Sequence, residues 1–308
     1  LLLNLLLSEL GGWSRELWLR PLAPFVSFGV GSVGLIAGLS THRHRRPALG
    51  LESYRVGLLS AFVPGLAGAA ALVLYVAMVA PDSLSTSTEW SSLAVAALVL
   101  ASAAAVSGSD RIDEVLAEER PRPSVSVHLL YNAAWLSEIV GIVLFGLVYC
   151  VDHVPVLALP RDPTAVEWLG ISLALGALVG ALAALMIGRG NDAERLLIAT
   201  LSTTVLASGL AYLLNLSPIL VNFVAGVVLG RSSHGAPLLA RLRPLERPVQ
   251  IVLFMVLGAS WTLPPTVAWL LVVLFVLLRL GGKLVADTLA RVGSPHPEKH
   301  PRGLGLAL

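Results

Sequence analysis

The stretch AAWLSEIVGIVLFGL, residues 133–147, is an apolar run that contains a single acidic residue, Glu138. No charged residue occurs in positions 127–137 before it or in positions 139–151 after it. A helix needs about 20 apolar residues to cross the hydrocarbon core of a bilayer, so this run is long enough to span a membrane. A carboxylate near the middle of such a span costs about 2.5–3.5 kcal/mol on insertion scales, so its presence indicates a functional or structural role.

The composition of the whole chain is that of an integral membrane protein. Of the 308 residues, 56% are hydrophobic and 13% are charged, and the mean hydropathy is +0.82. Soluble domains carry about 25% charged residues. The apolar runs are continuous rather than alternating, which favours helices over the strands of a membrane barrel. We expect an all-α polytopic membrane protein with about nine transmembrane helices, at 21–40, 56–80, 90–108, 126–151, 165–187, 195–214, 216–231, 247–262 and 266–290.

The basic residues gather in alternate loops of this arrangement. Of the 21 Lys and Arg residues, 18 belong to the segments on one side, which are 43–55, 111–122, 189–195, 231–247 and 279–302. The positive-inside rule places that side in the cytoplasm and residue 1 outside. Arginine outnumbers lysine 19 to 2, and Ala, Leu and Val dominate, which indicates the coding bias of a GC-rich bacterial genome. We expect a multi-pass protein of the bacterial inner membrane.

Several other patterns have simple explanations. Gly29, Gly31 and Gly34 have the spacing of a dinucleotide-binding loop, but they lie inside a predicted span, where small residues let helices pack closely. His42 and His44 lie in a basic run that is typical of an anchor at a helix end rather than of a metal site. The nucleophile motif G-x-S-x-G is absent from the sequence. We expect no enzymatic activity, no metal, no cofactor and no nucleic-acid partner.

Residues 232–246 form one of the two longest polar connections. Leucines recur there at helical spacing between basic residues, at Leu238, Leu239, Leu242 and Leu245. This pattern fits an amphipathic helix that lies in the membrane interface. It fits equally well an ordinary connector between two spans.

The predicted helical face around Glu138 carries small and aromatic residues, namely Tyr131, Ala134, Trp135, Gly141, Ile142 and Phe145. Such a face is expected to contact protein or a cavity rather than lipid. Glu138 then has two possible roles. It can carry a proton or an ion, or it can be a structural carboxylate bound to a neighbouring helix.

Two further polar features lie in predicted spans. Lys283 follows two glycines in an apolar run, and its ammonium can pair with Asp287, reach the cytoplasmic interface, or pair with Glu138 on another helix. Residues 101–110, ASAAAVSGSD, finish a span with small and hydroxyl residues. That segment either unwinds inside the membrane and offers carbonyl groups to an ion, or simply ends its helix.

With these features in hand, the chain resembles the monovalent cation:proton antiporter family, of the sodium/proton and potassium-efflux type. Residues 216–263 are similar to the family's small-residue span, its polar connector and the span that follows. Residues 271–290 resemble the next span, which carries a basic residue, and residues 31–40 resemble an early span. The resemblance covers about 21–308. It implies an inverted-repeat fold with broken crossing helices, and a homodimer.

The resemblance also implies roles for individual residues. Glu138 falls on the family's ion- and proton-binding carboxylate, Ser137 on the position before it, and Lys283 on its basic partner. The unwound motif of the family falls on Ser107, Gly108 and Ser109. The implied activity is exchange of Na⁺ or K⁺ for H⁺ across the bilayer by alternating access.

The chain departs from the family pattern at these positions. Glutamate replaces aspartate at 138, serine replaces an acid or amide at 137, and Ser-Gly-Ser replaces a Thr-Asp-Pro type of motif. The departures motivate an alternative function, a degenerate and non-transporting homologue that acts as a sensor or as an assembly subunit. The chain begins and ends in apolar runs, so we expect residues 1–308 to be a single transmembrane transporter domain truncated at both ends.

Overall fold

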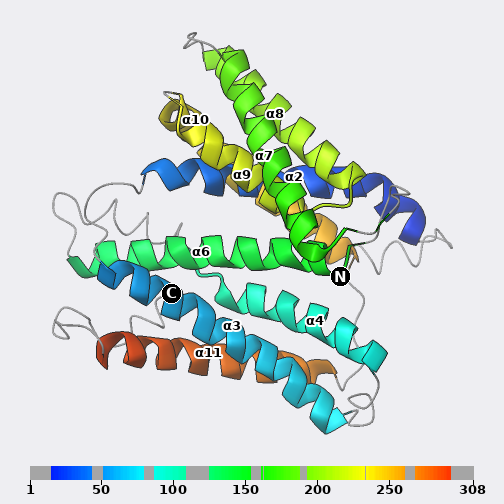
Figure 1. Cartoon of the computed structure of the whole chain (residues 1–308), viewed down its shortest axis with the longest axis vertical. Helices are drawn as coiled ribbons and strands as arrows, with labels where there is room; N and C mark the ends of the chain where they lie inside the picture. The colour runs from blue at the N-terminus through cyan, green and yellow to red at the C-terminus, as the bar shows by residue number, and fades with distance from the viewer. Residues whose placement is uncertain are drawn as a thin grey trace. The chain divides into compact units, whose positions relative to one another are not determined.

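The computed structural model describes residues 15–43, 51–79, 87–108, 125–153, 161, 163–187, 193–232, 234–260 and 268–292. Within these residues the regular structure is helical throughout, and no strand occurs. The helices are α2 (Arg15–Arg43), α3 (Leu51–Val79), α4 (Ser87–Ala105), α6 (Val125–Val151), α7 (Ala165–Ile187), α8 (Ala193–Leu213), α9 (Pro218–Gly230), α10 (Gly235–Ser260) and α11 (Ala268–Val292) (Figure 1).

Each predicted span falls on one of these helices. Six of the described helices are long and apolar enough to cross a membrane, at Pro21–Thr41, Ser53–Val79, Leu130–Val151, Ala165–Ile187, Leu196–Leu213 and Ala268–Val292. Two shorter apolar helices are Ser92–Ala105 and Pro218–Gly230. Helices suit these runs because lipid offers no partner for a backbone N–H or C=O, so each must be paired within the protein. The prediction of an all-α polytopic membrane protein is confirmed.

The chain forms two compact units. Unit 1 comprises residues 1–45 and 149–263 and contains α2, α7, α8, α9 and α10. Unit 2 comprises residues 46–148 and 264–308 and contains α3, α4, α11 and α6 as far as Val148. Each unit is therefore assembled from segments that lie far apart in the sequence.

In unit 1, helix α9 packs against α2, α7 and α8. A Cβ at Gly226 of α9 would overlap the Leu35 carbonyl oxygen and lie 3.0 Å from the Gly38 Cα of α2. A Cβ at Gly34 would likewise overlap the Ile219 carbonyl oxygen. These contacts are between backbones, so only glycine permits them. They confirm the prediction that the early glycines serve helix packing.

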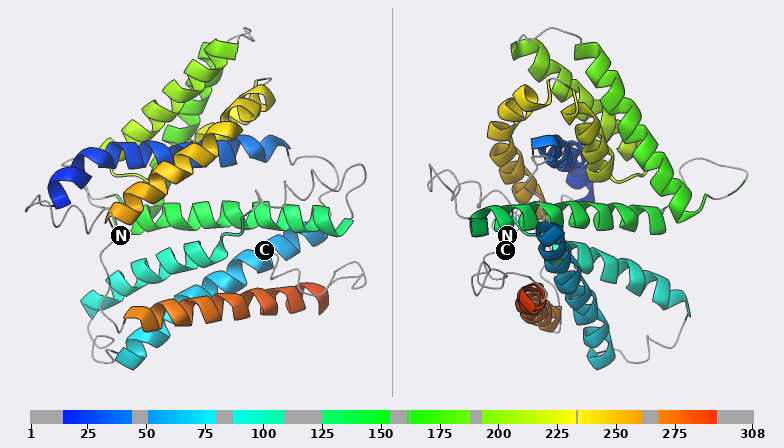
Figure 2. Two further views of the ribbon diagram at one scale, coloured as in Figure 1. Left: turned by 180° about the vertical axis from the view of Figure 1, so that it is seen from behind. Right: turned by 60° about the vertical axis from the view of Figure 1, so that its left-hand side comes forward.

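Helix α10 also belongs to unit 1, where it crosses α2 (Figure 2). Its residues 235–260 form one continuous helix, with Pro244 and Pro248 inside it. The alternative of an ordinary connector between two spans is wrong, because residues 235–246 are helical and continue into the next span without a break. The helical alternative is confirmed, and its place in the membrane interface stays a prediction. The buried leucines of this segment, Leu238, Leu239 and Leu242, pack in the core of unit 1 with Leu35, Leu39, Ala183, Leu196 and Leu229.

In unit 2, helix α3 packs against both α4 and α11 (Figure 1). A Cβ at Gly68 of α3 would lie 2.8 Å from Ala104 Cβ of α4 and 3.2 Å from Phe275 Cε2 of α11. A Cβ at Gly282 of α11 would lie 3.0 Å from the Cα of Pro64 in α3. The close approach at Gly282 brings the next residue, Lys283, into the interior of the unit.

Candidate functional site

The candidate site begins where helix α4 stops, in unit 2. The helix ends at Ala105, and residues 106–108 have no regular secondary structure. The chain nevertheless remains inside the protein at this point, because Ser107 is 1% exposed. The last carbonyl groups of a helix have no partner within it, and burial makes a partner from elsewhere necessary.

Helix α11 provides the partners. The Lys283 Nζ donates a hydrogen bond of 3.0 Å to Ser107 Oγ, and Arg279 Nη2 donates one of 2.8 Å to the carbonyl oxygen of Val106. The two cations are four residues apart, so they lie on one face of the helix. Lys283 is 5% exposed. The alternative in which its side chain extends to the cytoplasmic interface is therefore wrong.

Helix α6 packs against the same end of α4. A Cβ at Gly141 would overlap Val106 Cγ2 and lie 3.3 Å from the carbonyl oxygen of Ser102. Glu138 is three residues before Gly141 and lies on the same helical face, one turn away. Its neighbours on this face, Ala134 and Ile142, are 0% and 4% exposed, whereas Glu138 itself is partly buried. The prediction that this face contacts protein is confirmed.

Ser137 is fully buried, and its hydroxyl group is committed to its own helix. Its Oγ donates a hydrogen bond of 2.7 Å to the carbonyl oxygen of Ala134. The hydroxyl proton is therefore used, and only the oxygen lone pairs can serve an ion. A role for Ser137 in ion binding stays a prediction.

Two of the residues predicted from the sequence, Ser107 and Lys283, are therefore hydrogen-bonded to each other. The helix that carries a third, Glu138, packs against the same segment. Gly108 is exposed at the end of the segment, and Ser109 lies outside the described residues. The ion pair between Glu138 and Lys283 stays a prediction. Sequence reasoning missed Arg279, whose only signal was its position four residues before Lys283.

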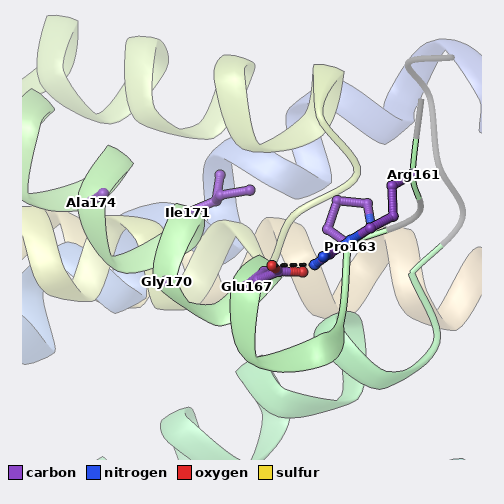
Figure 3. Close-up of a pocket in the computed structure, with 6 residues that line it drawn as sticks. All are labelled: Arg161, Pro163, Glu167, Gly170, Ile171 and Ala174. Atoms are coloured by element: carbon purple, nitrogen blue, oxygen red, sulfur yellow. Dashed lines mark hydrogen bonds and ion pairs between the residues drawn. The ribbon is translucent and has the colours of Figure 1, made fainter. Parts of the chain in front are cut away.

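A shallow surface hollow of about 580 Å³ lies elsewhere, at the start of α7 in unit 1. Arg161, Pro163, Glu167, Gly170, Ile171 and Ala174 line it, and Arg161 forms an ion pair with Glu167 (Figure 3). Glu167 also accepts a hydrogen bond of 2.7 Å from the backbone N–H of Thr164, while the Thr164 hydroxyl accepts one from the backbone N–H of Glu167. This reciprocal pattern caps the first turn of α7. The polar groups of the hollow therefore serve the helix end, and none of the predicted site residues lines it.

His153 follows the end of α6 and belongs to unit 1. Its ring stacks on Trp168 of α7, with the ring centroids 3.6 Å apart. Burial lowers the pKa of His153 from its ordinary value of 6.5, and the backbone groups of Asn215 and Tyr149 oppose that shift. Within the described residues, neither ring nitrogen makes a hydrogen bond of good geometry, so burial is the cause that dominates.

The chain matches the model of a known protein family over most of its length. The family model described as "Sodium/hydrogen exchanger, transmembrane" matches residues 35–306. The match includes Ser107, Ser137, Glu138, Arg279 and Lys283. No curated protein matches the chain.

Proposed function

Because the chain belongs to the sodium/hydrogen exchanger family, we propose that it exchanges Na⁺ or K⁺ for H⁺, and that the two compete for the carboxylate of Glu138. Family membership supports cation/proton antiport in general and an integral, multi-pass membrane protein. One observation carries the assignment of the site. The buried ammonium of Lys283 binds Ser107 at the end of α4, and α6 packs there one turn from Glu138.

The chemistry of these groups suits competition between a proton and a cation for one carboxylate. A carboxylate away from water is costly to keep charged and alone, so it binds whichever positive species is available, a proton or a metal cation. The end of α4 adds oxygen atoms, and the C-terminal end of a helix carries about half a negative charge. Alkali cations are hard ions that bind oxygen ligands, and helix ends of this kind hold them in transporters of known architecture.

In this proposal Lys283 changes its partner according to the charge of Glu138. Its ammonium has three N–H donors, and the hydrogen bond to Ser107 uses one of them. When Glu138 is empty and ionised, Lys283 pairs with it. When a proton or a cation neutralises Glu138, Lys283 leaves Glu138 and forms its hydrogen bond to Ser107 again. Each ligand thereby displaces the same internal partner, which makes their binding mutually exclusive.

Alternating access would carry the loaded site from one side of the membrane to the other. Such a mechanism needs two bodies that move relative to each other, and the division of the chain into two compact units supports this part of the proposal. The ion gradient drives the exchange, so the proposal includes no covalent step, metal cofactor or nucleotide. A homodimer in a bacterial inner membrane is also proposed, on the family resemblance and the composition.

The test is transport by the full-length protein in vesicles, with proton movement followed after a Na⁺ or K⁺ gradient is imposed. Glu138→Gln keeps the size of the side chain and removes its charge, and Glu138→Ala removes both. We expect both variants to exchange no faster than vesicles without protein. The matched control is Glu167→Gln, which removes a carboxylate that is paired with Arg161 outside the site, and which we expect to exchange as the wild type does.

Two outcomes would count against the proposal. If Glu138→Ala exchanges cations for protons as fast as the wild type, the assignment of Glu138 is wrong. If the folded wild-type protein exchanges neither Na⁺ nor K⁺, the non-transporting alternative is the better description. Exchange by the purified wild type would eliminate that alternative.

A further inference from the structure

Arg279 has no part in the exchange described above, although it reaches the same segment as Lys283. Its guanidinium is partly buried, and Nη2 lies 2.8 Å from the carbonyl oxygen of Val106. Val106 is the first residue after α4, and Ser107 follows it directly. Arg279 therefore binds the main chain of the segment, while Lys283 binds the side chain of the next residue.

Two cations at this position have an energetic cost. Like charges four residues apart on a helix repel each other, and burial strengthens that repulsion. A single cation would already satisfy the negative end of α4. The presence of the second cation therefore indicates a separate task for it.

The chemistry of the two side chains suits different tasks. Arginine stays charged under all ordinary conditions, and its planar donors bind a fixed acceptor in a defined direction. The ammonium of lysine is a compact charge on a flexible stem, and it can move between acceptors. In this site Arg279 has the fixed acceptor, a backbone carbonyl, whereas Lys283 has a hydroxyl that it can leave.

The opposite side of Val106 is also held. Its Cγ2 rests on Gly141 of α6, where there is no room for a Cβ. One residue before α4 ends, Ala104 packs closely on Gly68 of α3. Val106 is thus fixed between α6 and α11, and the α11 contact is the hydrogen bond from Arg279.

We propose that Arg279 is a positioning residue, which holds the end of α4 in place so that Ser107 keeps its position when Lys283 leaves it for Glu138. The consequence for transport rests on the proposed function. The contact between Arg279 and Val106 does not, and it can be tested separately.

The experiment compares three variants of the full-length protein with the wild type. Arg279→Met removes the charge and the donors, Arg279→Lys keeps the charge and a donor, and Leu280→Met changes the next residue, whose side chain is exposed. The first measurement is hydrogen–deuterium exchange of the peptide that contains residues 102–108. The second is the rate of cation/proton exchange as a function of cation concentration.

We expect Arg279→Met to lose protection in residues 102–108. We also expect it to raise the cation concentration for half-maximal exchange by about tenfold, the effect of one charge-assisted hydrogen bond, with a smaller loss of maximal rate. Arg279→Lys should recover part of both effects, and Leu280→Met should match the wild type. If Arg279→Met does not fold, Arg279→Gln takes its place, since it removes the charge and keeps a donor.

Unchanged protection in Arg279→Met would overturn the inference, whatever transport shows. Lost protection with an unchanged half-maximal concentration would also overturn it, because the contact would then be structural only. If the wild type does not transport, the proposed function fails, and the protection of residues 102–108 still decides whether Arg279 holds the end of α4.

Discussion

At the scale of single residues, three charged side chains of the candidate site belong to apolar helices of unit 2, namely Glu138 of α6 and Arg279 and Lys283 of α11. Glu138 and Lys283 could be predicted because a charged group in an apolar run is costly and therefore conspicuous. Arg279 could not be separated from the basic residues that mark the cytoplasmic ends of spans. Its acceptor is the carbonyl oxygen of Val106, 173 residues away in the chain, and no local sequence pattern predicts such a contact.

The hydrogen bond between Lys283 and Ser107 gives a prediction for stability. Ser107→Ala leaves one donor of a buried ammonium without its acceptor, so we expect it to lower the free energy of unfolding by about 1–3 kcal/mol. The matched control is Ser102→Ala, because the hydroxyl of Ser102 donates its hydrogen bond to the Val99 carbonyl of its own helix. The midpoint of thermal unfolding in detergent measures the stability of both variants. Equal shifts in the two variants would contradict the account of Lys283.

His153 gives a prediction for pH dependence. Because burial lowers its pKa below 6.5, the folded protein takes up this proton less readily than the unfolded chain does. The histidine therefore costs no stability above its ordinary pKa, and stability is lost as the pH falls below that value. His153→Phe keeps an aromatic ring on Trp168 and does not titrate. We expect its unfolding midpoint to fall less than that of the wild type on acidification, and an identical fall would contradict this.

At the scale of helices, the sequence predicted the position of every described helix because the apolar runs are long and the loops between them are polar. Helix α10 differs from the prediction in its length, because it begins at Gly235 rather than at residue 247. Its first part was predicted as a separate segment because basic residues and two prolines interrupt the apolar pattern. Leu238, Leu239 and Leu242 are buried by α2, α7, α8 and α9, and that packing depends on the tertiary structure rather than on local sequence.

The crossing of α2 and α9 gives a prediction at this scale. Gly226→Ala places a Cβ against the backbone of Leu35 and Gly38, which cannot rotate away as a side chain could. We expect a loss of about 1–3 kcal/mol in the free energy of unfolding, as for other overpacked sites. Gly209→Ala in α8 is the control, since no atom lies within 4 Å of its added Cβ. Unfolding in detergent should show the control unchanged or more stable, and equal stability of both variants would contradict the close crossing.

At the scale of the whole molecule, residues from distant parts of the chain meet within one unit. Ser107 and Lys283 are 176 residues apart, and both belong to unit 2. The sequence could predict that these residues are important, and the family resemblance implied which groups act together. Periodicity and charge could not show which helices pack together, because each apolar run fits many neighbours equally well.

The orientation in the membrane is a prediction at the same scale. The positive-inside rule places residues 81–89 outside and residues 293–302 in the cytoplasm. A cysteine introduced by Ser85→Cys should react with a membrane-impermeant thiol reagent added to intact cells, and one introduced by Ser294→Cys should react only after the cells are opened. The native Cys150 is 4% exposed and gives little background. The reverse labelling pattern would contradict the predicted orientation.

The proposed exchange requires that one carboxylate, Glu138, binds either a proton or a cation. The most direct test measures the cation concentration that gives half-maximal exchange in vesicles at several pH values. Competition for one site predicts that this concentration rises steadily as the pH falls, while the maximal rate at saturating cation stays constant. A half-maximal concentration that does not change with pH, together with a maximal rate that falls, would contradict the claim.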